Sequence, residues 1–164
     1  MKRISILFPL LLACSLVFFS CGKKQPRDER AEFRSSLTKE DTTQMLALCD
    51  RCMETLKAGR TDEALAMLHL YDDSTRTVLP LSEQKQRELR RTFKLFPVVN
   101  YSLVYYTFTT QGLNDVKYSV EFFEKPAGDP TPNSIGFMFN PVKVDGQWYL
   151  TVKEADQDID RMRN

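Results

Sequence analysis

Residues 142–150 read Val-Lys-Val-Asp-Gly-Gln-Trp-Tyr-Leu, with Asp145 and Gly146 between two short runs of strand-forming residues. An Asp-Gly pair in this setting predicts a two-residue hairpin turn, because both central positions of that turn require a positive φ. Placing the pair at the tip defines the register of the hairpin. The opposed pairs are then Val144 with Gln147, Lys143 with Trp148, Pro141 with Leu150 and Phe139 with Val152.

This register predicts which face of the hairpin lies against the core. Paired residues share a face of a sheet, and alternate residues along one strand point the same way. The apolar face comprises Ile135, Phe137, Phe139, Trp148, Leu150 and Val152, whereas Met138, Asn140, Tyr149 and Thr151 fall on the opposite face.

Two further strands are expected before this hairpin. Residues 116–122 alternate apolar and polar side chains, as a strand with one buried face does. Within residues 99–108 the apolar set changes parity between Tyr105 and Tyr106, which predicts a β-bulge that turns both sets inward. A loop containing Pro and Gly at 125–133 separates the second strand from the third. The whole region therefore predicts a four-stranded antiparallel meander.

Helices are expected before the strands. Thr38 can cap a first helix, and Thr61 can cap a second, shorter one after Gly59. A turn region then leads to a third helix, which Ser82 can cap and which stops at Pro97. The predicted class is α+β, with two to three N-terminal helices packed on one side of a four-stranded curved antiparallel sheet.

The amino terminus has the organisation of a secretory signal that ends at a lipid-modified cysteine. Lys2 and Arg3 supply positive charge, residues 4–19 carry no ionisable amine or carboxylate, and Ser20 and Cys21 close the apolar run. This order is typical of bacterial lipoprotein signals. We therefore expect cleavage before Cys21, acylation of the new terminus by a fatty acid such as palmitate, and a location at the cell envelope.

Two alternatives to Cys21 stay open. Cleavage before Cys14 fits the usual consensus better, because Leu11 stands three positions before it, whereas Phe18 stands there for Cys21. That cut would leave an apolar amino terminus, and the apolar segment ahead of it would be near the lower limit of about 7 residues. The other alternative is an uncleaved helix, since residues 4–20 approach the roughly 20 residues that span a bilayer. Each outcome attaches the rest of the chain to a membrane, outside the cytoplasm.

Removal of residues 1–20 leaves 144 residues, a length suited to one domain. Lys2 and Arg3 leave with the signal, so 21 of the 23 basic residues remain against 22 acidic ones, for a net charge of −1. This balance gives no indication of nucleic-acid binding. Residues 21–37 carry many charges and few large apolar groups, so they are expected to form a flexible tether. Residues 38–164 are expected to form a single domain with a short acidic C-terminal tail.

This succession of helices and a curved antiparallel sheet resembles the cystatin-like and nuclear-transport-factor-two-like superfamily. The resemblance covers roughly residues 38–153 and rests on the helix pair around 58–65, the aromatic strand 101–108 and the closing hairpin 142–150. That superfamily shares a cone shape more than it shares residues. Similarity to its lipid-anchored bacterial members implies a small envelope domain.

The resemblance also implies where the site of an enzyme would lie. Enzymes of that superfamily resemble one another in placing a carboxylate or histidine among apolar walls, where desolvation raises the pKa of a carboxylate. Here the predicted core face of the last three strands holds no Asp, Glu or His. We expect a non-enzymatic domain that binds a small ligand or an envelope protein through its aromatic-lined cone or the outer face of the sheet. A small isomerase- or hydrolase-like enzyme with its site in the cone is the alternative. The candidate ligand-binding residues are Tyr101, Tyr105, Tyr118 and Trp148.

Two further pairs of residues could carry chemistry. His69 lies four positions before Asp73, so one helix face could bring them together to orient an imidazole base, although a surface hydrogen bond is the simpler interpretation. Cys49 and Cys52 lie at core positions in the middle of the first helix. We interpret them as buried thiols or a structural disulfide rather than a redox site. With only the distant His69 they do not complete a tetrahedral zinc site, and no metal or cofactor is expected.

Overall fold

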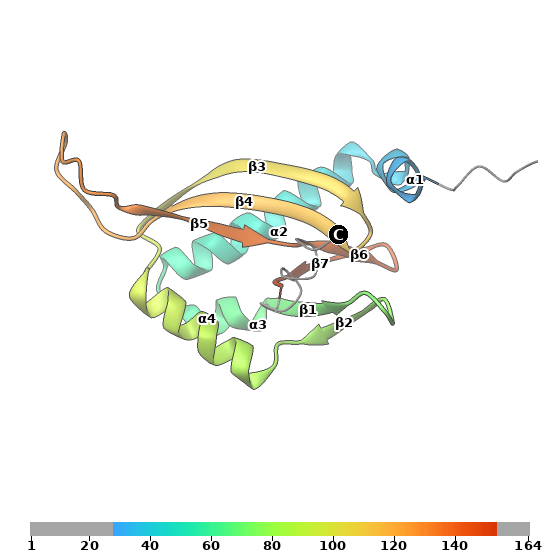
Figure 1. Ribbon diagram of the computed structural model, residues 1–164, viewed down its shortest axis with the longest axis horizontal. Helices are drawn as coiled ribbons and strands as arrows, with labels where there is room; N and C mark the ends of the chain where they lie inside the picture. Colours follow the sequence, from blue (N-terminus) through green and yellow to red (C-terminus); the bar gives the residue numbers. More distant parts are fainter. Residues whose placement is uncertain (1–27, 154–164) are drawn as a thin grey trace, which may run out of the picture.

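The structure is a computed structural model that describes residues 28–153 (Figure 1). The expected signal peptide, Cys21 and most of the expected acidic tail lie outside these residues. The described part of the chain is an α+β domain with its strands in two sheets. Its elements are α1 (Glu29–Ser36), α2 (Lys39–Lys57), α3 (Thr61–Ala66), β1 (Leu68–Asp72), β2 (Thr77–Pro80), α4 (Glu83–Leu95), β3 (Asn100–Thr110), β4 (Leu113–Glu121), β5 (Ser134–Phe139), β6 (Val142–Val144) and β7 (Gln147–Thr151).

The ends of α2 and α4 lie where the sequence predicts them. Thr38 caps α2 through a capping box, in which its hydroxyl accepts from the backbone of Asp41 and the Asp41 carboxylate accepts from the Thr38 N–H. Gly59 follows α2 with a φ of 72°, a left-handed conformation that glycine adopts at low cost. Ser82 caps α4, which ends just before Pro97.

The second predicted helix is shorter than expected. α3 ends at Ala66, and Arg60 rather than Thr61 occupies its N-cap position. The chain then enters β1, which runs parallel to β7, with Leu68 opposite Leu150, and antiparallel to β2, which replaces the expected turn region. The sequence pattern around 68–72 does not predict β1, because this strand depends on parallel pairing with β7, which lies far along the sequence.

α1 occupies part of the segment that was expected to be a tether. Asp28 caps it by accepting from the N–H groups of Arg30 and Ala31, at 3.1 and 3.2 Å. Arg34 Nε donates to the carbonyl oxygen of Phe108 at 2.8 Å, which attaches the helix to β3. The tether prediction is therefore wrong from Glu29 onward, because docking against β3 stabilises a helix too polar and too short to persist alone.

β3, β4 and β5 form an antiparallel sheet in that order, which agrees with the first part of the predicted meander. Figure 1 shows this sheet as a curved layer with α2, α3 and α4 on its concave side. The alternation of β4 is as predicted, since Val116, Tyr118 and Val120 are all buried. The residues opposite them on β5 are Phe139, Phe137 and Ile135.

The predicted β-bulge in β3 is present, but it is centred at Val104. Leu103 pairs with Tyr118 and Tyr105 pairs with Lys117, so Val104 has no partner on β4. The extra residue changes the parity of the strand. As a result Tyr105 shares the convex face with Lys117, which corrects the prediction that it turns inward.

The meander does not continue as one four-stranded sheet. β5 ends at Phe139, and after Asn140 and Pro141 the chain forms β6, which pairs with β7. The hairpin has the predicted register near its turn, where Lys143 lies opposite Trp148. β7 pairs on its other side with β1, giving a second sheet of order β2-β1-β7-β6.

Buried hydrogen bonds join the two sheets at Asn140. Asn140 and Thr151 were expected on the outer face, but both are buried, and they are linked twice: the Asn140 N–H donates to the Thr151 carbonyl at 2.8 Å, and the Thr151 hydroxyl donates to the Asn140 carbonyl. The Asn140 side chain donates to Asp115 Oδ1 at 2.6 Å, and the Asn114 side chain donates to the Pro141 carbonyl at 2.9 Å. This junction is where β4, β5, β6 and β7 meet.

We expect Asn140→Ala to lower the free energy of unfolding by about 1–3 kcal/mol, because it leaves buried polar groups without a donor. Urea denaturation followed by circular dichroism measures this change. Asn100→Ala is a matched control on the exposed start of β3, expected to change the free energy by less than about 0.5 kcal/mol. Equal effects of the two substitutions would show that the junction is not a stabilising element.

An ion pair connects the start of α2 to β6. Lys143 Nζ lies 2.5 Å from Asp41 Oδ1, and both side chains are largely shielded from solvent. The hydrogen bond from Lys143, followed by that from the Thr38 backbone, lowers the pKa of Asp41 to about 2. Because the folded state lowers this pKa, the stabilisation is present above the ordinary value of 3.8 and is lost as the pH falls toward 2.

Asp41→Asn is therefore expected to destabilise the domain by about 1 kcal/mol at pH 7, the usual cost of weakening a helix cap. The difference from the native chain should shrink between pH 4 and about pH 2, as measured by urea unfolding at several pH values. Glu40→Gln, at an exposed neighbouring carboxylate, should leave stability at pH 7 nearly unchanged. A difference that stayed constant down to pH 2 would contradict the ionic role of Asp41.

Candidate functional site

Two of the four aromatic residues predicted to bind ligand hold α2 against the sheet. The Tyr118 side chain is fully buried, and its hydroxyl donates to Asp50 Oδ1 at 2.6 Å. The Tyr101 hydroxyl donates to Glu54 Oε1 at 2.6 Å, and the two tyrosine rings lie 5.7 Å apart. Burial, followed by these hydrogen bonds, raises the pKa of both tyrosines, so both hydroxyls are protonated donors at neutral pH.

The other two predicted residues lie elsewhere. Tyr105 is 41% exposed on the convex face, as a consequence of the bulge at Val104. Trp148 is buried with its ring 5.8 Å from that of Phe108, and its Nε1 finds no acceptor among the described residues. None of the four residues lines the cavities described below, so the structure does not gather them into one binding site.

Side chains fill the space between the concave face of the sheet and the helices. The cavity there has a volume of only about 10 Å³ and is lined almost entirely by apolar groups, among them Met53, Phe93 and Val120. Such a space is too small for more than about one water molecule. The interior of the predicted cone is therefore packed core, and a ligand site must be sought at the surface.

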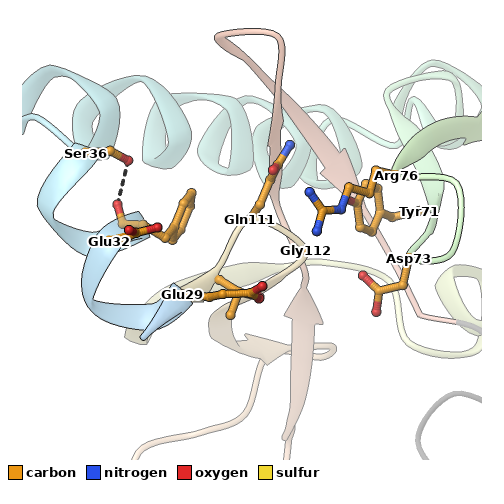
Figure 2. A pocket seen from close by; sticks show the side chains of 10 residues that line it. Glu29, Glu32, Ser36, Tyr71, Asp73, Arg76, Gln111 and Gly112 are labelled. Atoms are coloured by element: carbon orange, nitrogen blue, oxygen red, sulfur yellow. Dashed lines mark hydrogen bonds between the residues drawn. The ribbon is translucent and has the colours of Figure 1, made fainter. Parts of the chain in front are cut away.

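A larger cavity of about 510 Å³ opens where three distant segments meet. α1 forms one wall, the β1–β2 hairpin forms the opposite wall, and the turn between β3 and β4 lies between them (Figure 2). Its volume falls within the range of about 300–1,000 Å³ that is usual for small-molecule sites. A smaller cavity of about 200 Å³ lies between α4 and β5, near Lys85 and Met138.

Charged groups of opposite sign face this larger cavity. Glu29 and Glu32 come from α1, and Asp73 and Arg76 come from the β1–β2 hairpin. Figure 2 shows the Arg76 guanidinium directed toward the space between the two walls. No ion pair joins Arg76 to Glu29 or Asp73 in the part of the chain that the structure describes. The charges of Glu29, Asp73 and Arg76 are therefore available to a ligand.

The β1–β2 turn is held in shape by its own hydrogen bonds. Asp72 Oδ1 accepts from the Ser74 hydroxyl at 2.6 Å and from the Ser74 N–H at 2.9 Å. The Ser74 hydroxyl, followed by Thr75, lowers the pKa of Asp72 to about 2, so this carboxylate stays ionised as the anchor of the turn. Arg76 has a φ of 56°, an unfavourable conformation for a residue with a Cβ, and this backbone points its side chain at the cavity.

Gly112 allows the β3–β4 turn to approach the hairpin closely. A Cβ at this position would overlap the ring of Tyr71 and lie 2.5 Å from Asp73 Oδ1, closer than such atoms can approach. Burial, and then the nearby Asp73 carboxylate, raise the pKa of Tyr71, so its hydroxyl stays protonated and can donate a hydrogen bond at neutral pH. The contact surface of the cavity thus depends on the absence of a side chain at Gly112.

The structure does not bring His69 and Asp73 together. His69 lies in β1, where its Nδ1 is 3.2 Å from the Met67 carbonyl and its ring is 5.8 Å from that of Tyr149. Asp73 follows the far end of the same strand, about 13 Å away along an extended chain. The helical spacing that suggested the pair is lost because this segment is a strand. Asp73 instead lines the polar cavity.

Cys49 and Cys52 are free thiols buried in the core, so the first of the two interpretations is correct and the disulfide is not formed. Burial raises the pKa of both thiols, to about 12 for Cys52, so neither supplies the thiolate that redox chemistry needs. Residues 28–153 contain no group of three or more His, Cys, Asp or Glu side chains placed to hold a metal ion. The same residues include no helix long and apolar enough to cross a membrane.

Sequence reasoning missed the polar cavity. Its residues lie in segments that the sequence predicts to be a tether, the end of a helix and a turn. No pattern in the sequence connects these segments. Sequence reasoning also missed an exposed apolar run in the edge strand β3, where Leu103, Val104, Tyr105 and Tyr106 are all 41–54% exposed.

Comparisons with known proteins yield one structural similarity. No protein-family model matches the chain, and no curated protein matches it. A crystal structure from Campylobacter jejuni, described provisionally as an NTF2-like transpeptidase, is 16% identical in sequence, with a TM-score of 0.37. The match covers 71% of this chain and 100% of the other. At this TM-score the similarity supports no conclusion about function. The structure itself defines the class as an α+β domain with a polar surface cavity.

Proposed function

We propose that this chain is a lipid-anchored cell-envelope protein whose α+β domain binds a small ligand without catalysing a reaction. The proposed anchor is Cys21, attached to the domain through the few residues before α1. The proposed ligand site is the cavity of about 510 Å³ between α1, the β1–β2 hairpin and the β3–β4 turn. The NTF2-like, cystatin-like family remains part of this proposal, on the resemblance of its sequence pattern.

The packed interior is the observation that carries this proposal. An enzyme in the cone would need a carboxylate or histidine inside an open apolar pocket. Here the interior cavity is about 10 Å³, His69 is engaged with Met67 and Tyr149, and Asp50 and Glu54 accept hydrogen bonds from tyrosines. The cavity of about 510 Å³ is open and polar, which suits recognition of a soluble polar group.

The anchor position also favours a site at this end of the domain. Cys21 precedes Glu29 by eight residues, a length of chain that spans at most about 28 Å when fully extended. An acylated Cys21 would therefore keep the α1 wall of the cavity close to a membrane surface.

Mass spectrometry of the mature amino terminus tests the anchor. The expected result is a chain that begins at an acylated Cys21, with attachment lost in Cys21→Ala and kept in Cys14→Ala. Attachment that survived Cys21→Ala, or a chain that retained residues 1–20, would overturn this cleavage site.

Gly112→Ala tests the cavity. The added methyl group must displace Tyr71 and Asp73, so binding at this site should weaken at least tenfold while the fold persists. The measurement is the thermal shift of the full chain in detergent with a panel of amino acids, amines, small organic acids and inorganic phosphate, with circular dichroism to check folding. In the control Gly136→Ala, a Cβ would meet only the flexible end of Lys117, at 3.1 Å. The cavity proposal fails if no member of the panel binds, or if Gly112→Ala and Gly136→Ala bind equally well.

A further inference from the structure

The two walls of the cavity offer charges that do not neutralise each other. Glu29 stands on α1, and Asp73 and Arg76 stand on the hairpin, yet none of the three has an ion pair within the described chain. Glu32 also lines the cavity but takes part in another interaction, so it is not counted among the unpaired charges. A ligand that met these groups would need a cationic and an anionic group at once.

Ligands with a single charge fit this arrangement less well. An anion would pair with Arg76 but would be repelled by Glu29 and Asp73 across the same cavity. A cation would pair with these carboxylates but would be repelled by Arg76. A zwitterion carries one group of each sign, so it can pair with Arg76 and with the carboxylates of Glu29 and Asp73 at the same time. The guanidinium is suited to bidentate contact with a phosphate or carboxylate, while the two carboxylates accept from an ammonium group.

The neutral groups of the cavity complete the match. The Tyr71 hydroxyl is a protonated donor, and the Gln111 amide can both donate and accept. The unfavourable φ of 56° at Arg76 is maintained in a turn braced by Asp72, so the guanidinium is presented by a defined backbone. Such preorganisation lowers the cost of binding.

We propose that this cavity binds a small zwitterion, with its phosphate or carboxylate on Arg76 and its primary ammonium group between Glu29 and Asp73. This inference rests on the proposed use of the cavity as a ligand site. The ligand chemistry has two sources: the ethanolamine phosphate head group of a membrane lipid, within reach of an anchored Cys21, or a free amino acid or short peptide.

Isothermal titration of the full chain in detergent tests the ligand class. Glycerophosphoethanolamine, whose phosphodiester carries one negative charge as in the lipid, and alanine are the zwitterionic probes, and ethanolamine and inorganic phosphate carry charge of one sign only. We expect at least one zwitterion to bind at least tenfold more tightly than both probes of one charge sign. Arg76→Gln, Glu29→Gln and Asp73→Asn should each weaken its binding about tenfold, equivalent to about 1.4 kcal/mol. Arg87→Gln, in an exposed pair with Glu83 on α4, is the matched control and should bind normally.

The outcomes separate this inference from the broader proposal. If phosphate or ethanolamine alone bound as tightly as both zwitterions in a manner sensitive to Gly112→Ala, the zwitterion class would be wrong and the cavity would still be a ligand site. If none of these four probes bound, the zwitterion inference would fall, and the cavity proposal would fall with it only if no member of its wider panel bound either. Normal zwitterion binding by Arg76→Gln would also overturn the inference.

A second arm identifies the source. The chain is placed in phosphatidylcholine vesicles with or without phosphatidylethanolamine. The zwitterionic probe that bound in detergent is then titrated into each. A lower apparent affinity for the titrated zwitterion in the vesicles that contain phosphatidylethanolamine shows competition and supports the lipid head group. Equal affinities in both vesicles support the free zwitterion.

Discussion

The buried hydrogen bonds around Asn140 are the constraint on which the arrangement of the two sheets depends. Polar groups inside a protein are costly unless they are paired, and here Asn140, Thr151 and Asn114 satisfy one another and the adjoining backbone. Pro141 follows with no N–H to satisfy, so the chain can leave its pairing with β4 without an orphaned donor. The strand that continues as β6 then pairs only with β7. One expected sheet is thereby divided in two.

This division creates the cavity. β1 pairs in parallel with the edge of β7 that β6 leaves free. The β1–β2 hairpin then places Asp73 and Arg76 beside the turn at Gly112. α1 completes the third side because Arg34 attaches it to the end of β3. Each of the three segments is a surface element that forms no pocket alone. Loops and turns held by a rigid scaffold are where binding groups usually gather, and the cavity is an example of that arrangement.

The aromatic residues that suggested a binding cone serve the packing of the domain. Tyr118 and Tyr101 use their hydroxyls to bind carboxylates of α2, which fixes the helix across the concave face. An aromatic ring with a polar end is equally suited to line a pocket or to join a helix to a sheet. Composition alone therefore does not distinguish the two roles. The filled interior does, and it moves the candidate site from the cone to the edge of the domain.

Features that depend on neighbouring residues were determined by the sequence alone. They include the caps at Thr38 and Ser82, the turn at Asp145 and Gly146, and the buried face of β4. Features that depend on distant contacts were decided only by the tertiary structure. The change from α3 to β1 required a parallel partner in β7, and the outward turn of Tyr105 required the register of β4. The placement of Glu29 across the cavity from Asp73 and Arg76 had no local signal, because it results from packing between α1 and the β1–β2 hairpin, which are far apart along the chain.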